Sequence, residues 1–385
     1  MGNKLLVRSY NVELGDCIYV RIPNGAEDFH LLIDCGTKGK KILLETAVKH
    51  LFDILPDGDA PGKKRLDLLV ATHRHEDHIK GFDPVYFEDI QVKNIWLSAL
   101  MDPNHPQAQK SLRLEKFTAG LVQEVVENTT NLSPEMEMLA SLFSIDNVGA
   151  ENFLREDLPR MNNIQTQYVV AGKTAADYGI HLAEASIKIL GPEKDIDGYY
   201  LGDDLDDTLN SIESFESDLT GQNINSDNLP HNISHQDFRR LKSRMLSDAF
   251  SFAEVASKVT NHSSVVLMIE WGGRRLLFVG DTEWHGEYRK NKRNGGWNVM
   301  WNVRKNELNK PVDFLKIGHH GSYNATPWDG DKPADYEVNQ MLNAILPLPP
   351  NGRTPKAKAI VSTERSTYKT IPKADLLVEL EIGRA

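Results

Sequence analysis

Three histidines and one aspartate crowd into the segment THRHEDH and are the most chemically informative feature of the sequence. The side chains are those of His73, His75, Asp77 and His78. Neutral imidazole and carboxylate together suit zinc, manganese or iron, and a loop can point several such groups to one side. We therefore predict a metal-binding loop, although this motif alone completes no site. The alternative is a solvated loop rich in histidine.

Further residues of the same types border hydrophobic segments late in the chain. Asp281 comes directly after RRLLFVG, and His262 comes just before SSVVLMIE. Two adjacent histidines, His319 and His320, follow VDFLKIG. Polar residues just past the carboxyl ends of strands are typical of sites in α/β proteins. We expect these residues to lie together with the histidine-rich loop.

Short hydrophobic runs and helical periodicities alternate along the chain, which predicts an α/β fold. The expected strands lie within 3–12, 17–22, 29–34, 65–71, 92–98, 185–192, 263–270, 274–280, 312–318 and 357–362. The expected helices are 41–55, 111–130, 133–143 and 236–259. We predict one domain over 1–385, with an insertion that is helical at about 104–180 and, at 195–255, acidic and partly mobile before a final helix.

Composition narrows the class of protein further. The only two cysteines, Cys17 and Cys35, exclude a disulfide scaffold and flank a predicted hairpin, across which they could face each other. No apolar run approaches the ~18 residues of a membrane helix, so we expect no membrane partner. Because the first residues lack the apolar core of a signal peptide, we expect a cytoplasmic protein.

Charge is unevenly distributed in this acidic chain. The formal net charge of −11 argues against unspecific binding of nucleic acid over the whole surface. The segment 288–310 is nevertheless basic, and it contains Arg289, Lys290, Lys292 and Arg293 together with Tyr288, Trp297 and Trp301. Bases neutralise phosphates and aromatic faces stack on nucleobases, so we predict substrate binding by these four basic residues. The alternative is a solvated helix with two aromatic side chains in the core.

Taken together, the motifs resemble those of the metallo-β-lactamase superfamily. Within it, the sequence is most similar to the hydrolase domain of the DNA-internalisation competence proteins (the ComEC family) and their soluble relatives. Besides the histidine-rich loop, the resemblance rests on Gly15-Asp16, Ile33-Asp34-Cys35-Gly36, Asn261-His262-Ser263-Ser264, Gly280-Asp281, His319-His320-Gly321-Ser322, and Ser362 with Tyr368 and Pro372. It covers 1–100, 185–195 and 260–385.

This resemblance implies an αβ/βα sandwich of the metallo-β-lactamase fold and a site for two divalent metal ions, zinc or manganese. His73, His75 and His262 would hold the first ion, and Asp77, His78 and one of His319 and His320 the second. Asp281 would bridge the two ions, and Asp34 would support the loop from behind the ligands. A lone histidine before a strand is often structural, which is the alternative for His262.

The histidine pair needs two different roles. Adjacent side chains at a strand end point in roughly opposite directions, so both cannot be equivalent ligands. Because Gly321 lets the backbone turn at once, we assign His320 to the second metal and His319 to the substrate side. The predicted catalytic residues are Asp77, His319 and Glu283, and Ser322 is predicted to bind substrate. For Glu283 the alternative is an exposed turn carboxylate.

The resemblance also narrows the reaction. Position 281 is Asp rather than the Cys common in β-lactamases, and position 75 is His where di-iron oxidoreductases have Glu. We therefore predict a dinuclear hydrolase of phosphodiesters, most of all a nuclease on DNA or RNA, with a protein partner recruited through the insertion. The alternatives are a hydrolase of phosphocholine or a cyclic nucleotide, a carboxylic-ester, thioester or lactone hydrolase, and a binding protein with an incomplete metal set.

Overall fold

The computed structural model describes residues 4–128, 145–202, 251, 253–349, 357–363, 370–381 and 384. The predicted helix at 133–143 and most of the acidic part of the insertion lie outside the described residues. The same holds for most of the predicted helix at 236–259, of which 251 and 253–259 are described and helical; the described helix continues to 262.

The first sheet contains the central strand that leads to the histidine-rich loop. Its order is β1-β2-β3-β5-β7-β8. The strands are β1 (Leu6–Ser9), β2 (Cys17–Ile22), β3 (Phe29–Cys35), β5 (Leu68–Ala71), β7 (Ile95–Ser98) and β8 (Thr166–Val169). The first three are antiparallel neighbours, and β3, β5, β7 and β8 run parallel. The carboxyl ends of these four strands therefore share one edge.

The second sheet comes from the C-terminal half of the chain, in the order β13-β12-β11-β10-β9. Its strands are β9 (Ala185–Gly191), β10 (Val266–Trp271), β11 (Arg274–Phe278), β12 (Phe314–Ile317) and β13 (Lys358–Val361). The predicted hairpin β10–β11 is confirmed and turns at Gly272 and Gly273, both with positive φ. Because β11, β12 and β13 are parallel, Asp281 and the histidine pair follow neighbouring strand ends.

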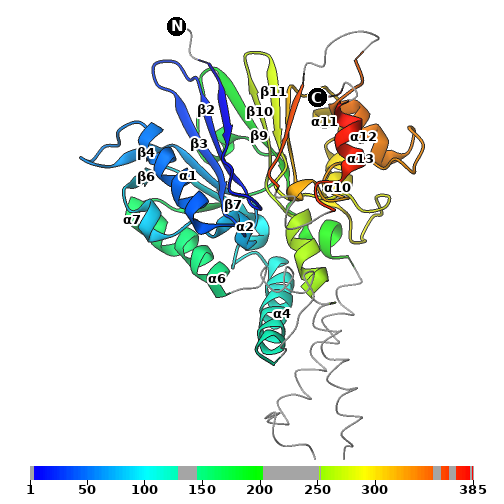
Figure 1. The fold of residues 1–385 in the computed structure, drawn as a ribbon, viewed down its shortest axis with the longest axis horizontal. Helices are drawn as coiled ribbons and strands as arrows, with labels where there is room; N and C mark the ends of the chain where they lie inside the picture. Colours follow the sequence, from blue (N-terminus) through cyan, green and yellow to red (C-terminus); the bar gives the residue numbers. More distant parts are fainter. Residues whose placement is uncertain are drawn as a thin grey trace, which may run out of the picture.

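Helices cover the outer face of each sheet, which gives four layers (Figure 1). The first sheet is covered by α1 (Lys41–Ile54), α3 (Pro84–Phe87), α6 (Ile145–Asn152) and α7 (Leu158–Asn162). The second is covered by α10 (Gly296–Val303), α11 (Lys305–Leu308), α12 (Glu337–Ile345) and α13 (Ala374–Glu381). The predicted fold class, an α/β protein built as an αβ/βα sandwich, is therefore confirmed.

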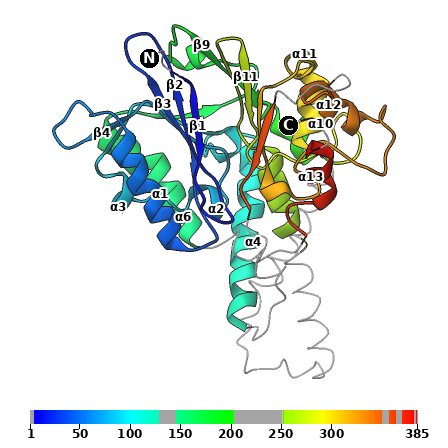
Figure 2. The same cartoon turned by 45° about the horizontal axis from the view of Figure 1, so that its top comes forward.

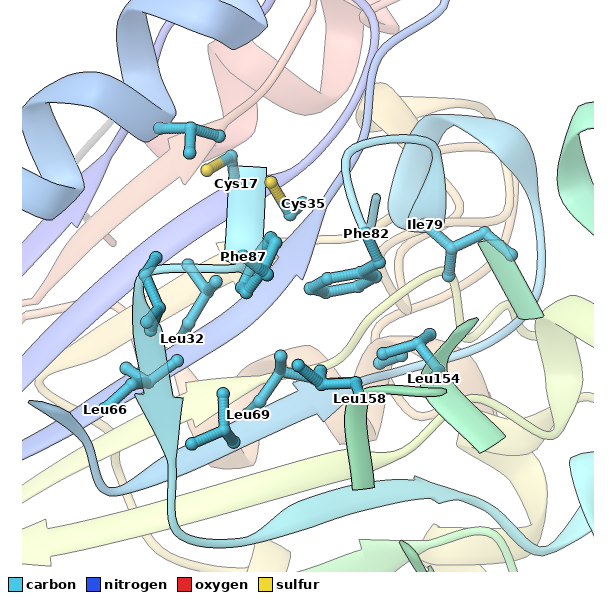
Figure 3. Packing of buried hydrophobic residues seen from close by; sticks show 14 of the residues in the cluster. Cys17, Leu32, Cys35, Leu66, Leu69, Ile79, Phe82, Phe87, Leu154 and Leu158 are labelled. Carbon is cyan, nitrogen blue, oxygen red and sulfur yellow. The ribbon is translucent and has the colours of Figure 1, made fainter. Parts of the chain in front are cut away.

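Alternation along the strands explains why the sheets pack on both faces. In β3, Leu31 and Ile33 point to the core between the two sheets, whereas Leu32 belongs to the core under the helices. The alternation ends at Asp34, whose φ is positive, and Cys35 joins Leu32 on the helix side. Successive side chains of a strand point to opposite faces, so a strand buried on both sides must be apolar throughout. Figure 3 shows the helix-side core, where Cys17 and Cys35 lie close together as buried free thiols.

The remaining elements connect or brace these layers. They are the two-stranded parallel sheet β4 (Lys64–Leu66) and β6 (Ile90–Val92), α2 (Glu76–Ile79), α4 (Ala108–Asn128), the 3-10 turns 99–101, 175–178 and 319–321, and the π-helical turns 153–157 and 197–201. α4 extends beyond the sandwich below α2 (Figure 2). Within the described residues, no helix combines the length and apolar character needed to cross a bilayer.

Two expectations need correction. The strand predicted at 65–71 is divided at Asp67, which accepts a hydrogen bond from the His30 N–H (2.8 Å), so that β4 leaves the sheet and pairs with β6. The segment predicted to be helical at about 104–180 contains β8, which extends the first sheet beside β7. The run Thr166–Val169 is rich in strand-forming residues, but its four residues are too short for periodicity to distinguish from a helix.

Candidate metal centre

The histidine-rich loop begins where the buried strand β5 ends. His73 and His75 are two residues apart, both are buried, and His73 Nε2 lies 3.0 Å from His75 Nδ1. Burial lowers the pKa of His73 and lowers that of His75 to about 3. Both imidazoles are therefore neutral near pH 7, the form in which a ring nitrogen can bind a metal.

Asp34 supports this loop from behind, at the carboxyl end of β3. Its Oδ1 accepts a hydrogen bond from the Thr72 N–H (2.7 Å), and its Oδ2 accepts from the Thr72 hydroxyl (2.8 Å). The same Oδ2 lies 2.7 Å from His78 Nδ1. Since an ionised carboxylate only accepts, Nδ1 of His78 carries the proton, and Nε2 faces the other side of the ring. Metal-binding histidines are commonly oriented in this way.

Asp281 connects the loop to the second sheet. Its backbone N–H donates to the Ser264 hydroxyl (3.2 Å), and its Oδ1 accepts from the backbone N–H of His319 (2.9 Å). The carboxylate reaches both halves of the loop, with Oδ1 3.2 Å from His78 Nε2 and Oδ2 3.8 Å from His73 Nε2. Asp281 therefore lies between two sets of imidazoles.

A strained turn after β12 directs the side chains of the two adjacent histidines to different neighbours. His319, His320 and Gly321 all have positive φ, of 39°, 54° and 76°. Left-handed backbone at two successive non-glycine residues is costly and is found where function requires it. The turn places His320 Nε2 2.7 Å from Asp77 Oδ2, while Nδ1 of His320 donates to the Ser362 carbonyl (2.8 Å).

The side chains form three overlapping groups, each able to offer its ligand atoms within 4.8 Å of one another. The groups are His73, His75 and Asp281; Asp77, Asp281 and His320; and Asp16, His78 and Asp281. All of these residues are buried, and Asp281 belongs to every group. A carboxylate with two oxygens shared by neighbouring groups suits a bridge between two ions.

The hydrogen bonding of the cluster fits a bound cation. His78 and His320 each direct Nδ1 to an acceptor outside the cluster, so that Nε2 faces a carboxylate within it. Two buried atoms form no hydrogen bond of good geometry and have only ion-pair neighbours: His78 Nε2 lies 3.2 Å from Asp281 Oδ1, and Asp77 Oδ1 lies 3.5 Å from Nζ of Lys38. Although burial opposes charge, nearby cationic groups hold the pKa of Asp77 and Asp281 well below the usual range, so both are ionised. Inward-facing nitrogen atoms beside ionised carboxylates form a donor set for zinc or manganese.

One polar pair at the site has a weak sequence signal. Asp16 precedes β2, and both of its carboxylate oxygens lie 2.9 Å from Nζ of Lys316, which is 1% exposed. The Asp16 N–H also donates to the Asp77 carbonyl (2.9 Å). Asp16 is part of a motif noted in the sequence, but no local pattern connects it with a lysine 300 residues away.

Glu283 and His319 form a second polar pair beside the cluster. The Glu283 Oε1 atom lies 2.5 Å from His319 Nδ1 and accepts from the Asn261 side-chain amide (3.1 Å). Glu283 is 5% exposed, which excludes the exposed turn carboxylate considered from the sequence. Burial opposes both charges, yet their mutual attraction lowers the pKa of Glu283 to about 2 and raises that of His319 to about 9. The Ser322 hydroxyl lies 3.1 Å from the same His319 nitrogen.

His262 lies outside the three groups. It is buried, its Nδ1 has no hydrogen-bond partner, and burial lowers its pKa to about 4. The charge of Glu283 raises the pKa of His262, whereas His285 and Arg293 lower it further. The structure thus places His262 beside the Glu283–His319 pair, and its role as a ligand of the first metal stays a prediction.

The basic segment adjoins this second pair, but part of its predicted role is wrong. Trp297 is fully buried and Trp301 is 5% exposed, and both belong to the core between α10 and the second sheet. Neither indole face can stack on a nucleobase. Arg289 and Lys290 are exposed. Burial is the largest cause of the lowered pKa of His285, and the charges of Arg293 and Arg289 lower this pKa further. Lys292 and Arg293 are half-buried.

Several solved structures are similar to this chain, and two of them illustrate the likeness. No protein-family model matches the sequence, and no curated protein matches it. Zinc-bound PqqB from Methylobacterium extorquens aligns with 94% of this chain and 82% of its own, at 9% identity and a TM-score of 0.36. A beta-lactamase domain protein from Burkholderia ambifaria aligns with 49% of this chain and 44% of its own, at 12% identity and a TM-score of 0.24. The chemistry of the site follows from its own side chains.

Proposed function

We propose that this protein is a dinuclear metal-dependent hydrolase of phosphodiesters, and that its substrate is DNA or RNA. The observation that carries the proposal is the set of three buried groups that share Asp281. His73 and His75 would hold one ion, and Asp77, His78 and His320 the other, with Asp281 between them. Two such ions, zinc or manganese, would activate a water molecule and neutralise charge on the phosphoryl oxygens.

The residues around the ions would divide the remaining work. Asp34 and the Ser362 carbonyl orient His78 and His320 through their outer nitrogens. His319 is held by Glu283 at the side of the cluster. From there His319 would donate a proton to the leaving oxygen, while Ser322 would contact the substrate.

Charge beside the site favours a polyanionic substrate. The pKa of His285 is lowered first by burial and then by three nearby cations, Arg293, Lys258 and Arg289. Among the main causes of this pKa shift, only the charge of Glu283 raises the pKa. Lys258, on the helical segment 253–262, was not among the predicted substrate residues. Basic groups next to a phosphate-directed metal site would bind the backbone of a nucleic acid at a distance from the cleaved bond. The motif likeness to the DNA-internalisation competence proteins supports the same substrate class.

The cellular setting is part of the proposal. Two buried free thiols and no further cysteine suit the reducing cytoplasm, where we propose that the protein works. A protein partner of the insertion stays a prediction, because most of its acidic part lies outside the described residues.

Charge reversal tests the substrate class. Changing Arg289, Lys290, Lys292 and Arg293 to Glu should lower cleavage of DNA or RNA at least tenfold and flatten its dependence on salt. Hydrolysis of bis-p-nitrophenyl phosphate should change less than twofold. The control, which reverses two charges instead of four, is Lys41→Glu with Lys49→Glu on α1, two exposed lysines over the other sheet.

The outcomes separate the alternatives. Equal losses on both substrates would assign the basic segment to folding, and activity on the small diester without any on nucleic acid would favour a small phosphodiester as substrate. Hydrolysis of carboxylic esters or lactones alone would contradict the phosphodiester assignment.

A further inference from the structure

Arg74 occupies the position between the first two histidines of the metal-binding loop. It is 5% exposed, and its guanidinium contacts none of the three candidate ligand groups. Its partners lie instead on the helical part of the chain, away from the two imidazoles on either side. A buried guanidinium in such a loop needs a physical reason, because removing its charge from water is costly unless acceptors surround it.

Three acceptors on three different elements hold this guanidinium. One terminal nitrogen forms an ion pair with Glu115 on α4 and lies 3.9 Å from Oε2 of Glu151 on α6. The other donates to the carbonyl of Leu100 (3.0 Å), in the turn that follows β7. Arg155 in turn lies 2.8 Å from the second oxygen of Glu151. Two arginines and two glutamates therefore alternate in one continuous network.

The elements that carry these acceptors are themselves firmly packed. Leu114, the neighbour of Glu115, belongs to a buried cluster with Leu100, Ala108, Leu201 and Val259. That cluster joins α4 to the helical segment 253–262, which ends at His262, next to the candidate site. Ala150 of α6 belongs to the core on the first sheet. Glu115 and Leu100 are therefore held by a buried cluster outside the metal-binding loop, whereas α6 packs both on the first sheet and against α2 at the end of that loop.

We propose that Arg74 is a positioning residue, and that Glu115 and Glu151 use it to hold the metal-binding loop in the geometry its ligands need. The proposal rests on the proposed metal function. It assigns a role to α4 and α6, which is to fix the loop through a residue that is not itself a candidate ligand. The loop cannot shift without uncovering a buried charge, so His73 and His75 keep their relative placement when no ion binds them. Residues that hydrogen-bond directly to metal ligands typically change metal affinity 10–100-fold, and we expect Arg74, which acts through the loop, to change it within that range.

The experiment compares metal binding and ligand geometry in variants of the network. The protein is stripped of metal and titrated with Co²⁺, whose visible spectrum reports the arrangement of its ligands. The variants are Arg74→Met, Glu115→Ala and Glu115→Gln. A control, Arg304→Met, breaks a similar ion pair in which Arg304 Nε and Nη2 lie 2.7 and 2.8 Å from the two oxygens of Glu193, with no contact to the metal-binding loop.

We expect Arg74→Met and Glu115→Ala to bind Co²⁺ 10–100-fold more weakly and with an altered spectrum. Glu115→Gln, which keeps an acceptor oxygen, should fall between Glu115→Ala and the wild type. Arg304→Met should lower the melting temperature without changing affinity or spectrum. If Arg74→Met does not fold, the ordered effect of the two Glu115 variants decides the question.

Two results would overturn the inference in different ways. Folded Arg74 and Glu115 variants with wild-type Co²⁺ affinity and spectrum, and only a lower melting temperature, would make the network a stabilising one and leave the proposed function intact. A wild-type protein that binds neither Co²⁺ nor Zn²⁺ would remove the proposed function and this inference together.

Discussion

Apart from Asp16, the first sheet supplies its candidate ligands from one short segment, 73–78, whereas the second supplies them from the ends of two strands, β11 and β12. The segment is held by hydrogen bonds that Asp34 accepts and by the ion pairs of Arg74. The ligand after β12 is held by a turn with three successive positive φ values. The comparison teaches that one half of the site is supported by side chains behind it, and the other half by its backbone.

The largest effect is expected from substitutions of His319 and His320, in the half of the site that is held by the turn with positive φ values. His320→Ala should lower both metal content and rate, because it removes a candidate ligand. His319→Ala should keep its metal and lose roughly 10²–10⁴ in kcat, the range for a general acid. Metal analysis with steady-state kinetics checks both variants. Loss of metal in His319→Ala together with full loading of His320→Ala would reverse the assignment.

The two halves meet at the buried pair of Lys316 and Asp16, which tests how strongly they are joined. Lys316→Met should destabilise the protein by about 3–5 kcal/mol, because it leaves the Asp16 carboxylate buried without its cation. Adding Asp16→Asn should recover part of this loss. Denaturant unfolding of the metal-free protein measures both values. An unchanged stability of Lys316→Met would mean that water reaches Asp16 and that the pair does not join the halves.

A smaller effect is expected behind the first half. Asp34→Asn keeps the size of the side chain but loses one acceptor, so the orientations of Thr72 and His78 should loosen. Metal affinity should fall about 10–100-fold, with little change in the affinity for substrate. Competition with a chelator measures the first quantity and KM the second. Wild-type affinity in this variant would show that the loop needs no support from β3.

Local patterns in the sequence predict the candidate ligands of the first half well, but they do not predict the side chains that surround these ligands. The spacing of the histidines within 73–78 and the strand before them are visible in the sequence, and so is the strand before Asp281. The division of roles between His319 and His320 could be argued from strand geometry, and the structure places the two side chains in separate clusters.

Contacts between distant segments could not be predicted in the same way. Asp16 meets Lys316, and Arg74 meets Glu115, through tertiary packing that leaves no local pattern. Trp297 illustrates the opposite error, a local pattern that indicates a contact which the structure does not allow. An aromatic residue among basic ones indicated stacking on nucleobases, but Trp297 is packed in the hydrophobic core. Periodicity also failed at β8, where a short edge strand lies among helices.

The number of metal ions per chain tests the central claim most directly. Protein stripped by a chelator and reloaded with zinc or manganese should hold close to two ions per chain by elemental analysis. Asp281→Ala should retain fewer than one, because every candidate ligand group includes this residue. A fully folded wild type that takes up no more than one ion, with Asp281→Ala loaded to the same level, would contradict the dinuclear site.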